Sequence, residues 1–177
     1  MSSLQTLRAT AHPIRLRLLS LVTSTAMSAA EAARELGLSQ ATASYHLRVL
    51  ERAGLVAVVE VVRLRGGEAK RYRHESSALR FDVGAQTAAD TGDVSVEDQL
   101  VYVEALAEEL RRRSEQRTTG PGVSTDAELW VHPETWRRVV HHVGQASALL
   151  HAAAQRPRTP GTGPVSMTVS MFPMRRP

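Results

Sequence analysis

Residues 28–56 of this 177-residue chain read SAAEAARELGLSQATASYHLRVLERAGLV, and this stretch decides the fold. Ser28, followed three residues later by Glu31, has the pattern of a capping box, which predicts that a short helix begins there. Gly37 is suited to end that helix, and Ser39 can cap a second one after a turn of three residues. The stretch therefore predicts a helix, a tight turn and a second helix.

The second helix, predicted over residues 40–53 with a stop at Gly54, has an apolar face and a polar face. Ala43, Leu47 and Leu50 recur at steps of four and three residues, so they should pack against the preceding helices. The opposite face then carries small and polar side chains, namely Gln40, Ala41, Thr42, Ser44, Tyr45, Arg48 and Arg52. Because Gln pairs with adenine and Arg with guanine in the major groove, this face is suited to reading DNA, although a merely solvated face has the same composition.

The flanking segments add two helices and a hairpin. Residues 4–23 carry apolar side chains at helical spacing, with Pro13 at the first turn of the second helix. Downstream, the β-branched run 55–62, a glycine pair at 66–67 and the strand 69–73 predict a two-stranded hairpin. Its residues 63–73 hold five cations and one acid, which suits contacts with phosphates: Arg63, Arg65, Lys70, Arg71 and Arg73, with Glu68.

Positive charge is concentrated in the first half of the chain. Residues 1–75 hold 11 basic and 6 acidic side chains, whereas the remainder holds 11 and 12. A local positive excess in a chain of pI near 10.3 is typical of a protein that binds nucleic acid, although a solvated basic face also accounts for it. We therefore predict a winged helix-turn-helix DNA-binding domain over residues 1–78.

The second half of the chain is predicted to begin with a linker and a long helix. Residues 79–94 are rich in Gly, Asp, Ala and Thr, which is typical of a linker, and Ser95 begins a helix over residues 95–118. The apolar side chains of this helix form a narrow stripe: Val96, Leu100, Val103, Leu106 or Ala107, and Leu110. Because such a stripe needs a partner helix, we expect this helix to mediate dimerisation.

A small β-α-β unit is predicted over residues 126–173. It would consist of a strand at 127–131, a helix at 133–155 and a strand at 165–172, where apolar and polar residues alternate. The fold class is thus mainly α with a small amount of β structure. This unit would support dimerisation, bind an unknown small-molecule effector, or do both, and no effector residue is assigned.

The composition excludes several kinds of chemistry. Cysteine is absent, which rules out disulfides, thiolate metal sites, iron-sulfur clusters and cysteine nucleophiles. Four histidines gather in the C-terminal unit, at spacings that do not place them together on one helix face: His132, His141, His142 and His151. We therefore expect no metal site and no cofactor.

Membrane proteins and enzymes are also disfavoured. No apolar run is long enough to span a bilayer, and the first residues lack the pattern of a signal peptide, so we expect a cytoplasmic protein without membrane contact. We expect no enzyme, since phosphate-loop, nucleophile-elbow and zinc-protease motifs are missing. A winged helix that binds only other proteins stays open as an alternative, although the basic hairpin counts against it.

Two segments, AHPIRLRLL at 11–19 and LSQATASYHLRVLERAGLV at 38–56, resemble the ArsR-type winged helix-turn-helix regulators of bacteria. The resemblance extends over residues 4–75, less than half of the chain. It implies a homodimer that binds an inverted-repeat operator with one recognition helix per half-site. It also implies a repressor that a ligand releases, with activation left open as the other mode.

The resemblance assigns individual residues. The recognition positions are Gln40, Thr42, Ser44, Tyr45 and His46, with Arg48 beside them, and the wing positions are Arg63, Arg65, Lys70 and Arg71. His46 lies nearer the buried face of its helix, so the alternative for it is a packed residue with one structural hydrogen bond. The chain departs from metal-sensing members, because it has no cysteine and the predicted helix at 96–117 has no histidine.

Overall fold

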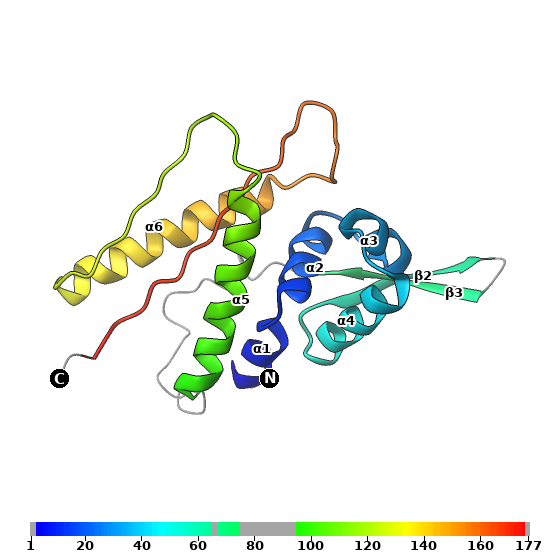
Figure 1. The fold of residues 1–177 in the computed structure, drawn as a ribbon, viewed down its shortest axis with the longest axis horizontal. Coiled ribbons are helices and arrows are strands. Elements are labelled where there is room, and N and C mark those ends of the chain that lie inside the picture. Colours follow the sequence, from blue (N-terminus) through cyan, green and yellow to red (C-terminus); the bar gives the residue numbers. More distant parts are fainter. Residues whose placement is uncertain (1–2, 65–66, 75–94, 176–177) are drawn as a thin grey trace.

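A computed structural model of the protein describes residues 3–64, 67–74 and 95–175, in which it forms six helices and three strands (Figure 1). The predicted linker at 79–94 lies outside the described residues. The elements in chain order are α1 (Ser3–Thr10), α2 (Pro13–Ser24), β1 (Met27–Ser28), α3 (Ala29–Leu36), α4 (Gln40–Arg52), β2 (Ala57–Leu64), β3 (Gly67–Arg73), α5 (Val96–Ser114) and α6 (Pro133–Ala152). The fold is mainly helical with a small antiparallel sheet, as predicted.

The caps around α3 and α4 form as the sequence predicts. The Oγ of Ser28 accepts a hydrogen bond from the N–H of Glu31, and the carboxylate of Glu31 accepts one from the N–H of Ser28. Gly37 ends α3 with a left-handed φ of 65°, and Ser39 caps α4 by accepting from the N–H of Thr42. Because each helix end is satisfied locally, the turn between the helices has a defined length.

The core of the N-terminal domain holds one face of α4. Ala43, Leu47 and Leu50 are fully buried, as predicted. Leu47 and Leu50 share a cluster with side chains from α2, α3, the sheet and the segment after α4, among them Leu18, Val22, Met27, Ala32, Val56 and Tyr72. The opposite face of α4 is consequently presented to solvent.

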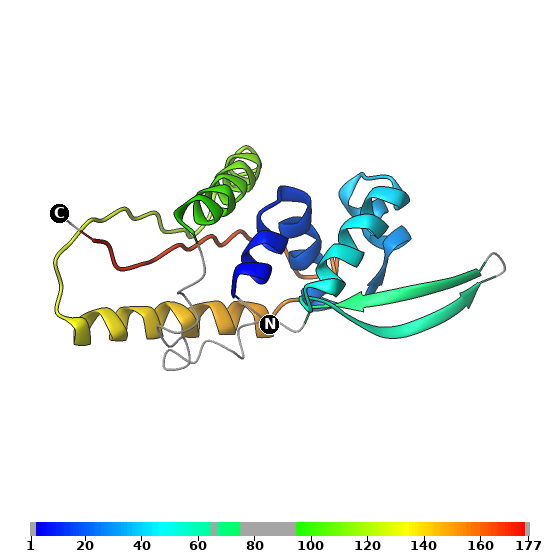
Figure 2. The ribbon, with the colours of Figure 1, turned by 90° about the horizontal axis from the view of Figure 1, so that it is seen from below.

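Strands β2 and β3 form the predicted hairpin, with Ala57 opposite Arg73 at its base. A bulge between Val58 and Glu60 interrupts the register. The sequence did not predict β1, which pairs with the other edge of β3 and gives the strand order β1-β3-β2. Figures 1 and 2 show the hairpin projecting from the domain, away from α5 and α6.

Helix α5 lies against α1 and α2, but not through its apolar stripe. Asp98 accepts two hydrogen bonds from Arg8 of α1, at 2.8 and 3.3 Å, and these bonds hold the pKa of Asp98 below its usual range. Ala105 and Glu109 are buried, and Glu109 pairs with Arg112 at 2.7 Å. The apolar stripe is left between 44% and 73% exposed, at Val96, Leu100, Val103 and Leu110.

The two strands predicted for the C-terminal unit are wrong. Helix α6 is present, close to the predicted range 133–155, but residues 127–131 and 165–172 form no strand. Alternation of polar and apolar residues places side chains on two faces, but a strand also needs a ladder of backbone hydrogen bonds to a neighbouring strand, which a pattern within one segment does not specify. The unit is therefore a helix between two irregular segments.

The segment after α6 returns to the N-terminal domain. Arg158, which has a left-handed φ of 64°, donates a hydrogen bond to the carboxylate of Glu35 on α3 at 2.8 Å. Further along, Arg113 of α5 donates to the Oγ1 of Thr168 at 3.4 Å. Polar contacts from this segment thus reach both α3 and α5.

Candidate DNA interface

The solvent-facing side of α4 carries most of the predicted recognition residues. Gln40, Tyr45 and Arg48 are exposed, with Tyr45 at 55%, and Thr42 and Ser44 are half-buried beside them. The exposed Ala41 and Arg52 lie on the same face. Because the core fixes the other face, these side chains project together from one side of the domain.

Two of these residues also form bonds within α4. The hydroxyl of Thr42 lies 2.8 Å from the Oγ of Ser39, so Thr42 belongs to the cap of the helix as well as to its exposed side. The Nε of Arg48 donates to the carbonyl of Ser44 at 3.3 Å, a long bond on the surface that water can replace. Arg48 therefore keeps its freedom to turn toward a ligand.

His46 does not belong to the exposed set. Its side chain is 7% exposed, and its ring centroid lies 4.6 Å from that of His12 and 5.1 Å from that of Tyr45. Its Nδ1 is buried and has no hydrogen-bond partner among the described residues. His46 is therefore packed in this structure, the alternative that the sequence left open, and an enclosed ring is poorly placed to reach a base or a phosphate.

The hairpin presents exposed cations. The side chain of Arg63 is 88% exposed and lies 3.5 Å from Glu68, and that of Lys70 is 55% exposed and lies 3.7 Å from Glu51. Ion pairs this exposed contribute little, so phosphates can replace their acids. Arg65 lies outside the described residues.

Arg73 is a further exposed cation of the hairpin, and it forms no ion pair within the described part of the chain. The sequence counted it among the hairpin cations without assigning it a contact. Arg73 ends β3 opposite Ala57 and therefore lies at the base of the hairpin.

Arg71 is a structural residue. Its Nη2 donates to the carbonyl of Ala26 at 2.6 Å, and its guanidinium lies 3.6 Å from Glu31 and 3.4 Å from Glu60. Alternate residues of a strand face opposite sides, so Arg71 points away from the side that carries Lys70. The guanidinium of Arg71 is therefore engaged by the domain itself, which disfavours the predicted DNA contact by this residue.

Two more cations of the first half bond the carbonyls at the C-terminal ends of helices. Arg15 donates to the carbonyls of Ala9 at 2.6 Å and Arg8 at 3.0 Å, at the end of α1. Arg17 donates to the carbonyl of Leu36 at 3.1 Å, at the end of α3. The positive excess of residues 1–75 therefore overstates the charge that is available to DNA.

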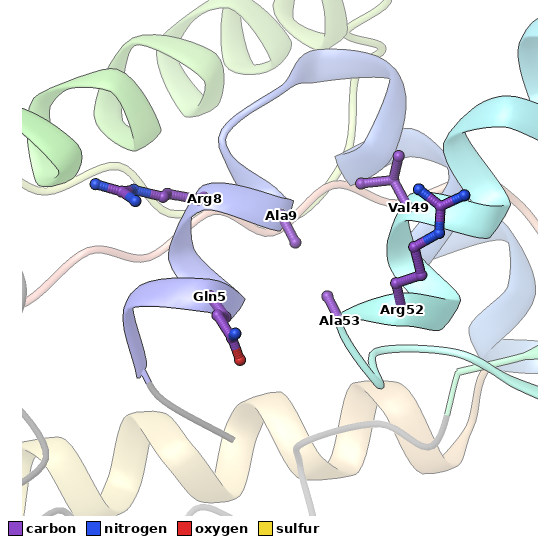
Figure 3. Close-up of a pocket in the computed structure, with 6 residues that line it drawn as sticks. All are labelled: Gln5, Arg8, Ala9, Val49, Arg52 and Ala53. Atoms are coloured by element: carbon purple, nitrogen blue, oxygen red, sulfur yellow. The ribbon is translucent and has the colours of Figure 1, made fainter.

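A hollow of about 330 Å³ lies between α1 and the C-terminal end of α4. Ala9, Val49 and Ala53 give it an apolar lining, with Arg8 and Arg52 beside them (Figure 3). The guanidinium groups of Arg8 and Arg52 point away from one another, and Arg8 is bonded to Asp98. The two arginines therefore do not converge on a site for an anion.

A second hollow, of about 490 Å³, lies on α6 and is lined by Arg137, Arg138, His141 and His142. All four side chains come from one helix, and both histidines are exposed.

Within the described ranges, no three potential metal ligands lie together. No helix there has the length and apolarity needed to cross a membrane.

Comparison with known families identifies the centre of this domain. Residues 10–59 match the model of a helix-turn-helix domain, a segment that contains all of α2, α3 and α4. A comparison with curated proteins found no match. The chain thus carries a helix-turn-helix domain of the DNA-binding kind, and the match ends within β2, before the C-terminal half.

Proposed function

We propose that the protein is a sequence-specific transcriptional regulator in which α4 reads the major groove of DNA. The observation that carries this proposal is the division of α4 into two faces. Leu47 and Leu50 anchor the helix in the core, while Tyr45 and Arg48 project outward with small neighbours that permit close approach. Gln40 lies at the N-terminal end, where the helix dipole favours contact with a phosphate or a base acceptor.

The hairpin supplies affinity that does not depend on sequence. Arg63 and Lys70 are exposed cations on an element that projects from the domain (Figure 2). Cations placed in this way contact phosphates and release counterions, so their contribution weakens as salt is raised. We propose that they hold α4 in register on the duplex.

We infer further that the protein acts as a homodimer on an inverted repeat. The exposed stripe of α5 supports this inference, because a second copy of α5 would cover the apolar side chains that a single chain leaves in water. A twofold axis would place one α4 in each half-site. The resemblance to ArsR-type regulators supports repression as the mode of action, with an effector of unknown chemistry and no catalytic role.

Selection of binding sites from a pool of random duplexes tests the proposal. We expect the protein to enrich one inverted-repeat sequence, and the variant Tyr45→Ala/Arg48→Ala to lose the enrichment, since each good base contact contributes about 1–3 kcal/mol. The control Arg138→Ala removes an exposed arginine from α6 and should enrich the same sequence as the wild type. If the folded protein enriches no sequence, this result would instead support the alternative of a winged helix that binds only other proteins.

A further inference from the structure

We propose that the pair formed by the half-buried His12 and the buried His46 positions the recognition helix and makes sequence-specific DNA binding sensitive to protonation. This inference rests on the proposed function of α4. His12 immediately precedes α2 and His46 lies in the middle of α4, with ring centroids 4.6 Å apart and ring planes inclined by 50°. The two imidazoles therefore form a direct contact between the start of one helix and the centre of the other.

His12 can cap α2 only while its Nδ1 is unprotonated. Its Nδ1 accepts a hydrogen bond from the N–H of Ile14 at 3.1 Å and thereby caps α2. Pro13 has no N–H, so Ile14 provides the first amide proton that the helix can offer to a cap. A proton on the Nδ1 of His12 would remove this acceptor and open the start of α2.

His46 is enclosed, so a charge on it lacks solvation. Its side chain is 7% exposed, and its Nδ1 has no partner within the described residues. Its ring and that of Tyr45, the exposed residue next to it in the sequence, meet edge to face with centroids 5.1 Å apart. Protonation of His46 would favour movement of α4 away from α2, and Tyr45 would move with it.

Burial and the nearby cation of Arg15 oppose protonation of the pair. Burial and the nearby cation of Arg15 on α2 lower the pKa of His12, whereas Glu108 on α5 acts in the opposite direction. Burial, His12 and Arg15 lower the pKa of His46. Tyr45 is the titratable neighbour of the pair from α4 itself. Because the packed form takes up protons less readily than an opened form, acid favours the opened form once the pH falls below about 6.5.

The test compares the affinities for a selected duplex and for a scrambled duplex of the same composition, between about pH 8 and about pH 5.5. Protonated histidines strengthen binding to the phosphates of any duplex, so we use the ratio of the two affinities, in which this general gain cancels. For the wild type we expect the ratio to fall by at least about threefold between these pH values, because the opened form takes up protons more readily than the packed form. For His12→Asn/His46→Phe we expect it to stay within about twofold, since Asn retains the cap acceptor and Phe fills the ring site without titrating.

His132→Asn is the matched control. His132 also precedes a proline at the start of a helix, but it is exposed and its side chain makes no capping bond. For this variant the ratio of the two affinities should fall in acid as it does for the wild type. A wild-type ratio that does not change with pH, or a fall that persists in the double variant, would overturn the inference.

A second measurement separates this inference from the proposed function. Failure to select any duplex at about pH 8 would count against DNA reading itself, whereas the urea midpoint of unfolding requires no DNA. We expect the wild type to lose stability relative to His12→Asn/His46→Phe as the pH falls from about 8 to about 5.5. Equal losses in the two proteins would overturn the role of the pair.

Discussion

Arg71 and Lys70 are neighbours on β3 with different roles. Arg71 bonds the carbonyl of Ala26 at 2.6 Å and ties β3 to the segment before α3, whereas Lys70 lies 3.7 Å from Glu51 at a half-exposed position. Arg71→Gln should lower the free energy of unfolding by about 1–3 kcal/mol, because it removes a charge-assisted hydrogen bond and leaves a carbonyl without its donor. Urea denaturation of the purified variant measures this loss.

Lys70→Gln is the matched control for Arg71→Gln, since it removes the same charge from the same strand. Its free energy of unfolding should stay within about 0.5 kcal/mol of the wild type, because exposed ion pairs contribute little. Equal losses in the two variants would show that Arg71 has no special structural role.

The sequence predicted single residues well where helical periodicity alone decides their exposure. Tyr45 and Arg48 face solvent because Leu47 and Leu50 face the core. For His46 the sequence left DNA contact and packing open, because its burial depends on a ring from another helix. The contacts of Arg71 were not predictable for the same reason, since its acceptor and its acids come from segments that only the fold brings together.

At the scale of one element, the capping box of α3 should have a measurable effect on stability. Ser28→Ala removes the acceptor for the N–H of Glu31, and it should lower the free energy of unfolding by about 1 kcal/mol. Ser20→Ala, at an exposed position inside α2, is the control and should not destabilise, because Ala is the better helix former. A Ser28→Ala variant as stable as the wild type in urea would show that the cap has no such role.

The sequence located elements well when their signals are local. The caps and stop residues of α3 and α4 predicted both helices, and the glycine pair at 66–67 predicted the hairpin. The strands at 127–131 and 165–172 were wrong, because a strand is defined by its partner, which no pattern within a segment specifies. For the same reason β1 was missed, since its two residues are a strand only through β3.

At the scale of the whole molecule, the face by which α5 meets the domain was not predictable. The sequence marked the apolar stripe of α5 as its face for packing. Instead, Asp98 bonds Arg8 of α1, and Glu109 is buried. Each of these acids is satisfied by an arginine, which lowers the cost of placing it there. The stripe is thereby left for another surface.

Charge placed on the stripe should separate the two protomers of the proposed dimer. Leu100 and Val103 are 56% and 44% exposed in the single chain, so Leu100→Glu/Val103→Glu should yield a folded monomer by sedimentation, with weaker binding to an inverted repeat. The control Leu149→Glu changes a side chain of α6 that is 74% exposed and should remain dimeric. A monomeric wild type, or a variant that stays dimeric, would contradict this role of α5.

The division of labour between α4 and the hairpin is tested most directly by measuring dissociation constants for a selected and a scrambled duplex across a salt series. Tyr45→Ala/Arg48→Ala should lose at least about tenfold of the ratio between the two duplexes. Arg63→Gln/Lys70→Gln should keep the ratio, while its slope of log affinity against log salt becomes shallower by about two. A ratio that survives the α4 substitutions and disappears with those of the hairpin would contradict the assignment of α4 as the reader.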